Sequence, residues 1–130
     1  MIAALYWCKV FGSDGCNITH WKNTPKIDIE RAHTSFKSSV MSRVGFSSAE
    51  WSDYHNAMLK FRNKYVAHHD NYSKPVPDFD IARDVAFAYD VWVRVLIRPD
   101  FYDGPLLSDD YPIWLKNAFL IAEKAIVTDL

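Results

Sequence analysis

The chain has 130 residues, of which 49% are hydrophobic and 15% aromatic. This composition excludes an intrinsically disordered protein and predicts a single domain over residues 1–130 with an ordinary hydrophobic core. Fifteen basic and sixteen acidic residues give a formal net charge of −1, which argues against a protein that grips long nucleic acids through many phosphates. Any contact with nucleic acid is therefore expected in a local cleft.

Apolar residues recur at helical spacing from the first residue, and Gly12 ends the pattern, so a helix is predicted over about residues 1–11. Because the pattern starts so abruptly, a further helix before it is left open. A polar loop follows, and a second helix is predicted over about residues 27–43. Gly45 ends this second helix.

The third predicted helix has the clearest start signal in the chain. Ser47 is followed three residues later by Glu50, which is the spacing of a capping box. In that arrangement the Ser side chain accepts a hydrogen bond from the backbone of the Glu, and the Glu side chain accepts one from the backbone of the Ser. The helix is predicted to run over about residues 48–68.

The remaining elements are also helical. A fourth, strongly amphipathic helix is predicted over about residues 79–98, because Pro99 cannot continue it. Asp110 and Pro112 open a last helix that reaches about residue 128. Since no stretch alternates at period two for long enough to form a strand, the predicted fold class is all-α. The expected architecture is an up-and-down bundle of four to five helices.

Cysteine usage and hydropathy bear on location. Cys8 and Cys16 are the only cysteines, and their spacing matches no zinc signature, so both are predicted to be structural thiols in a reducing compartment. No apolar run reaches the roughly 18 residues of a membrane span. The apolar start at residues 1–8 has neither a basic flank nor a cleavage site, so no signal peptide is expected. A cytoplasmic protein without a membrane partner is predicted.

One stretch carries candidate chemistry. Residues 61–70 read Phe-Arg-Asn-Lys-Tyr-Val-Ala-His-His-Asp and lie at the end of the third predicted helix. At about 100° per residue, Arg62 falls within the apolar side of that helix, together with His55 and His69. A cation in an apolar stripe is costly unless it is paired or used in chemistry.

The first interpretation of this pattern is structural. Arg62 would be a core arginine satisfied by an Asp or Glu of a neighbouring helix. His69 would then be a helix C-terminal residue favoured by the macrodipole.

The second interpretation rests on a family resemblance. The stretch resembles the signature of the HEPN superfamily of small helical proteins, in which an Arg is followed by a polar residue, often Asn, and a few residues later by a His. Here Arg62-Asn63 with His68 is the form with five intervening residues, and His69 gives the form with six. A helical bundle with the motif at the end of a long helix agrees with that fold.

The resemblance is specific over residues 61–70 and elsewhere only architectural, although the stretch from Trp7 to Trp21 looks like a loop of uncharacterised proteins in this group. Asp70 departs from a Tyr found at that place in some toxin members that are silenced by nucleotidylation. That form of regulation is therefore not implied here.

The resemblance implies a metal-independent endoribonuclease without a cofactor, acting as a homodimer in which two copies of the motif form one cleft. The RNA 2′-hydroxyl is the nucleophile, a His moves protons near neutral pH, and Arg62 neutralises charge on the phosphorane. The family pattern favours His68 as the catalytic His, whereas angular position beside Arg62 favours His69. Asn63 would orient or hydrogen-bond at the same site.

Further expectations concern substrate and partners. Lys64 and Tyr65 are predicted substrate contacts; Tyr65 could stack on a base, although simple packing is the favoured interpretation for this residue. Such an enzyme would act on RNA as a toxin or phage-defence effector, with a cognate antitoxin as a possible partner. Two other classes remain: a non-catalytic HEPN module that binds RNA, nucleotide or a nucleotidyltransferase, and a structural helical dimer.

A metal site is the least favoured alternative. It would assemble several imidazoles and one carboxylate in the bundle core, although no Glu-x-x-His or His-x-x-x-His pair is present. Its candidate ligands are His20, His33, His55, His68, His69 and Asp70. His20, next to Trp21, is predicted instead to pack the loop.

Overall fold

The computed structural model describes residues 2–13, 15, 18–23, 29–66, 74–97 and 104–128. In this part of the chain every regular element is a helix, so the all-α prediction is confirmed. The elements in order are α1 (Ile2–Phe11), the short 3₁₀ helix η1 (Trp21–Asn23), α2 (Ile29–Val44), α3 (Ser48–Phe61), η2 (Arg62–Val66), α4 (Phe79–Trp92), η3 (Val93–Ile97) and α5 (Leu107–Thr128).

The capping box predicted at the start of α3 is confirmed. The Ser47 backbone N–H donates to Glu50 Oε2 at 2.7 Å, and the Glu50 backbone N–H donates to Ser47 Oγ at 3.3 Å. Just before it, Gly45 adopts a positive φ of 69° and ends α2, a conformation that glycine reaches without a steric penalty. The turn between α2 and α3 is therefore specified by local chemistry.

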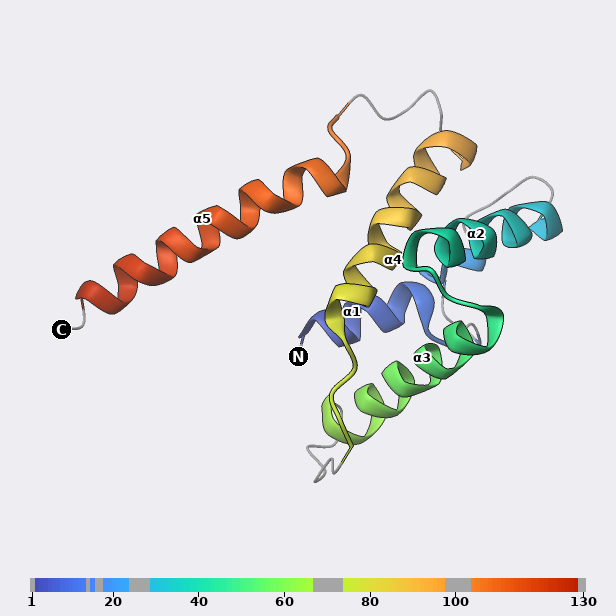
Figure 1. The fold of residues 1–130 in the computed structure, drawn as a ribbon, viewed down its shortest axis with the longest axis horizontal. Coiled ribbons are helices and arrows are strands. Elements are labelled where there is room, and N and C mark those ends of the chain that lie inside the picture. The colour runs from blue at the N-terminus through green and yellow to red at the C-terminus, as the bar shows by residue number, and fades with distance from the viewer. Residues whose placement is uncertain are drawn as a thin grey trace.

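The core is a cluster of buried side chains, half of them aromatic, from α1, η1, α2, α3 and α4. Figure 1 shows these four α-helices grouped in one body. α2 packs against α4, and α1 lies against α3 and η2. The Phe36 and Trp92 rings pack 5.3 Å apart, and Trp21 lies 4.2 Å from Phe36, so η1 is part of the same core. Each of these large rings buries much apolar surface, and this burial stabilises the fold of a small domain.

The fifth helix lies apart from the other four. α5 begins at Leu107, three residues before the predicted start at Asp110, and Figure 1 shows it leaving the end of α4 and extending away from α1–α4. The body of the protein is therefore a four-helix cluster, and α5 is an arm. None of the described helices is both long and apolar enough to cross a membrane.

Candidate functional site

The candidate motif begins where α3 changes its helical geometry. α3 is regular up to Phe61, and the next five residues, η2 (Arg62–Val66), form a wider π-helical turn. Such π segments within helices are frequent at functional sites. Because the turn is wider, the angular argument that placed His69 beside Arg62 does not hold beyond Phe61. His68, His69 and Asp70 lie outside the described residues.

Arg62 is half-buried, and its side chain is held by its neighbour. Arg62 Nε donates a hydrogen bond to Asn63 Oδ1 at 2.9 Å. Among the described residues the structure pairs no carboxylate with Arg62, whereas Arg83 and Arg94 each pair with an Asp. The core-arginine interpretation requires such a carboxylate, so nothing in the described part of the chain supports it. The Asn63 side chain holds the guanidinium through this hydrogen bond.

The first helix forms one wall beside Arg62. Cys8 of α1 is 1% exposed, and burial raises the pKa of its thiol above the ordinary value, while the positive charge of Arg62 opposes this rise. A buried thiol with a raised pKa is a poor nucleophile at neutral pH. Cys8 is therefore a structural cysteine, as predicted. Cys16 lies outside the described residues.

The predicted substrate contacts follow Arg62 directly. Asn63 and Lys64 are exposed, so both side chains are accessible to a ligand. Tyr65 belongs to η2 by its backbone, but its side chain lies outside the described part of the structure. The structure thus brings Arg62, Asn63 and Lys64 to one end of α3.

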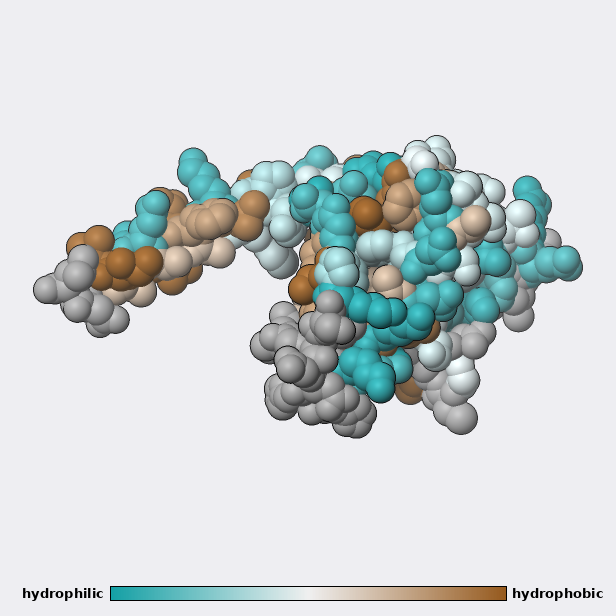
Figure 2. Space-filling model, turned by 60° about the horizontal axis from the view of Figure 1, so that its bottom comes forward, coloured by the Kyte–Doolittle hydropathy of each residue, from teal (hydrophilic) through white to brown (hydrophobic). Residues whose placement is uncertain are grey.

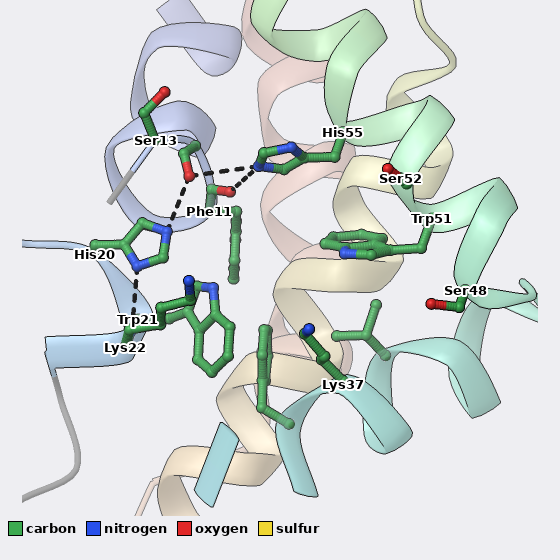
Figure 3. A pocket seen from close by; sticks show the side chains of 13 residues that line it. Phe11, Ser13, His20, Trp21, Lys22, Lys37, Ser48, Trp51, Ser52 and His55 are labelled. Carbon is green, nitrogen blue, oxygen red and sulfur yellow. Dashed lines mark hydrogen bonds between the residues drawn. The ribbon is translucent and has the colours of Figure 1, made fainter. Parts of the chain in front are cut away.

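A pocket of about 450 Å³ opens two turns earlier on α3 (Figure 3). It lies between the end of α1, the loop before η1, the middle of α2 and the first half of α3. Its lining is largely aromatic and also includes Lys22, Lys37 and three serines. The aromatic residues are Phe11, Trp21, Phe36 and Trp51, and the serines are Ser13, Ser48 and Ser52.

Two histidines of this pocket bond to the end of α1. His20 Nε2 donates to Gly12 O at 2.9 Å, and His20 Nδ1 accepts from the Lys22 backbone N–H at 3.2 Å, so its ring is neutral and fully bonded. His55 Nε2 donates to Phe11 O at 2.7 Å. His20 is therefore a loop-packing residue, as predicted.

The sequence did not predict this pocket. Its residues come from four separate segments, and the sequence singled out only His20, Trp21 and His55 among them, without indicating a shared pocket. The motif and the pocket share the third helix: Arg62 follows His55 by seven residues, which is close to two turns, or about 10 Å along the axis.

The metal-site hypothesis gains no support from the described residues, where no three His, Cys, Asp or Glu side chains gather as ligands. His20 and His55 bond to carbonyls of α1 and its following loop, and His33 Nε2 bonds to Lys22 O at 3.3 Å. The other proposed ligands lie outside this part of the chain.

Compared with family models, curated proteins and solved structures, the chain matches none. The resemblance to the HEPN superfamily therefore depends on the residues of the motif and on the helical architecture.

Proposed function

We propose that this protein is a metal-independent endoribonuclease of the HEPN type, acting as a homodimer in which two motifs form one cleft. The observation that carries the proposal is the state of Arg62. It is half-buried, oriented by Asn63, and committed to no carboxylate among the described residues. A guanidinium that is oriented by a neighbour and not neutralised by a carboxylate can bind an external anion such as a phosphate.

The reaction uses the substrate's own nucleophile. A catalytic His takes the proton of the RNA 2′-hydroxyl, and the 2′-oxygen attacks the adjacent phosphorus. The bond from phosphorus to the 5′-oxygen breaks, and that oxygen receives a proton from an acid, leaving a 2′,3′-cyclic phosphate and a 5′-hydroxyl. Arg62 stabilises the charge that develops on the phosphorane. His68 is the proposed base by its place in the motif, with His69 as the alternative.

The aromatic pocket supports a nucleotide as the ligand class. Its volume falls within the range of small-molecule sites, and two lysines stand among its aromatic lining residues. Bases stack on aromatic side chains, and phosphates bind lysine. We propose that the pocket holds a nucleotide of the RNA near the bond that is cut, so that recognition is local, as the net charge of −1 requires.

Replacing Lys37 with alanine is expected to weaken RNA binding severalfold and to reduce the slope of log affinity against log salt by about one, because one phosphate contact is lost. Lys37 is exposed, so the fold should be unaffected. Lys60→Ala is the matched control, since Lys60 is an exposed lysine of α3 that does not line the pocket. Fluorescence anisotropy at several salt concentrations measures both effects. If Lys37→Ala and Lys60→Ala had equal effects on RNA binding, the pocket would not be part of the RNA-binding surface.

RNA cleavage is expected to persist in excess EDTA at the rate seen without chelator, because an imidazole and a guanidinium fill the acid–base and charge-stabilising roles. The assay follows a labelled RNA on a denaturing gel. Cleavage that disappears with EDTA and returns with zinc or manganese would favour a metal enzyme instead.

A toxin or phage-defence role, with an antitoxin as partner, is the biological setting that we propose for this activity.

A further inference from the structure

Helix α5 exposes more apolar surface than a helix of a monomeric domain normally does. Every side chain from Pro112 to Val127 is exposed. Eight of them are large and apolar, with exposed fractions between 42% and 71%. They are Ile113, Trp114, Leu115, Phe119, Leu120, Ile121, Ile126 and Val127. Figure 2 shows apolar surface along the arm where it stands away from the body.

These residues form two stripes rather than one. At about 100° per residue, Trp114, Leu115, Phe119, Ile121 and Ile126 share one broad side of α5. A second stripe, formed by Ile113, Leu120 and Val127, repeats every seven residues and is separated from the first by polar residues on both sides. A helix with two apolar sides is expected to be enclosed by two surfaces.

The start of the arm is fixed to α4 by an ion pair and its hydrogen bonds. Arg94 Nε lies 2.8 Å from Asp90 Oδ1, and both side chains are mostly buried. The two terminal nitrogens of Arg94 donate to Gly104 O and Pro105 O at 2.7 Å each. Asp90 Oδ2 accepts from the Leu107 backbone N–H at 2.8 Å. The segment that leads into α5 is therefore held in one position.

The direction of the arm follows from this anchor. One turn into α5, the Tyr111 ring packs edge-on against Phe87, with 5.7 Å between ring centroids. From there the helix continues without interruption to Thr128, and Figure 1 shows it on the opposite side of α4 from α2. An arm held at two successive points cannot turn back over the α2–α4 side of its own chain without breaking these contacts.

That side of the body carries a matching groove. Between α2 and α4 lies a hollow of about 360 Å³, with Ala88 and Trp92 among its lining residues, Val91 as a partly exposed apolar wall and Arg43 as the one charged residue of its described lining. Two small residues of α2, Ser39 and Ser42, line it and allow another helix to approach closely. At its rim Val95 is 63% exposed, so the groove is itself an uncovered apolar surface.

We propose that α5 is an exchange arm that packs into the groove between α2 and α4 of a second copy of this chain. The two apolar stripes of α5 need two surfaces to cover them. A second copy of the chain offers two: its groove between α2 and α4, and its own α5. Because each chain carries one arm and one groove, the exchange closes as a two-fold dimer. This proposal does not depend on the RNA-cleavage proposal.

The available area fits such a dimer. A buried aliphatic side chain covers about 100 Å², so the eight side chains offer on the order of 800 Å², which is what one partner contributes to a stable interface. A membrane surface fits less well, because interfacial helices have a single apolar face opposite a Lys- and Arg-rich one. α5 carries Asp109, Asp110 and Glu123 against Lys116 and Lys124.

The test is the oligomeric state of the full chain without RNA, measured by sedimentation equilibrium at micromolar concentration. We expect the wild type to be a dimer of the 15.1 kDa chain. Phe119→Asp on the arm and Val95→Asp at the groove should each give a monomer with an unchanged helical circular dichroism signal. Val76→Asp is the matched control and should stay dimeric, because Val76 is 61% exposed but lies before α4, outside the groove.

A wild-type monomer would overturn the proposal, and so would a dimer that survives both Phe119→Asp and Val95→Asp. Vesicles of phosphatidylcholine and phosphatidylserine provide the competing outcome. If a monomeric wild type floats with them and Phe119→Asp does not, the arm is a membrane-binding helix and the exchange proposal is wrong. Loss of RNA cleavage plays no part in this readout.

Discussion

Replacing Arg62 with alanine is expected to reduce RNA cleavage by about 10²-fold or more while changing the free energy of unfolding by less than about 1 kcal/mol. The reason is that Arg62 is half-buried and bonds to Asn63, with no carboxylate partner among the described residues. A core arginine behaves differently, because its removal strands a buried carboxylate and costs about 3–5 kcal/mol.

Two measurements on the same purified variant separate these cases, a cleavage rate and a chemical denaturation curve. Arg83→Ala is the matched control, since it removes a partly exposed arginine whose ion pairs are with two carboxylates, the exposed Asp80 and the partly exposed Asp84. This control should keep full activity and lose little stability. A large loss of stability in Arg62→Ala, together with an inactive wild type, would establish the structural interpretation.

The histidine variants belong to the same experiment. His68→Ala is expected to lower the cleavage rate about 10²–10⁴-fold, the usual contribution of a general acid or base. His69→Ala should have the smaller effect. The reverse order would show that the motif form with six intervening residues is the active one. If both variants cleaved RNA as fast as the wild type, neither histidine would take part in catalysis.

Replacing Trp92 with alanine is expected to cost about 3–5 kcal/mol of unfolding free energy and to lower the melting temperature by on the order of 10 °C. Trp92 is 2% exposed, and its ring packs against Phe36 and Tyr89 from α2 and α4. With total stabilities of roughly 5–15 kcal/mol, this is a large fraction of what holds the domain together.

Trp92→Phe is the matched control, because the indole N–H of Trp92 has no hydrogen-bond partner among the described residues. Phenylalanine keeps a six-membered ring in the core and loses the unbonded N–H together with the rest of the five-membered ring, so its loss of stability should be smaller than that of alanine. Thermal melts followed by circular dichroism compare the two. If Trp92→Phe and Trp92→Ala lost the same unfolding free energy, the six-membered ring that phenylalanine retains would contribute nothing to stability at this position.

Much of the fold could be predicted because it is determined locally. The Ser47–Glu50 capping box, the stop at Gly45 and the apolar periodicity of α1 and α4 each specify an element from neighbouring residues. The π-helical turn after Phe61 could not be predicted, since the periodicity assumed a regular α-helix. Nor does the apolar pattern of the fourth predicted helix show which of its residues stay uncovered: Val95 is 63% exposed.

The candidate site also has a part that could be predicted from the sequence and a part that could not. Arg62 and Asn63 were found from an arrangement of residues close together in the sequence, and the structure adds their hydrogen bond. The aromatic pocket depends on tertiary packing, in which His55 of α3 reaches the carbonyl of Phe11 at the end of α1, 44 residues earlier. Spacing within one segment carries no signal for a contact of this kind.

The most direct test of the proposed activity compares an RNA oligonucleotide with DNA of the same sequence, both incubated with the wild-type chain in EDTA. Because the 2′-hydroxyl is the nucleophile, we expect the RNA to be cut to fragments with 2′,3′-cyclic phosphate and 5′-hydroxyl ends and the DNA to remain intact. Arg62→Ala should produce no fragments. RNA left intact by the wild type, cleavage of the DNA, or fragments with 5′-phosphate ends would contradict the proposal.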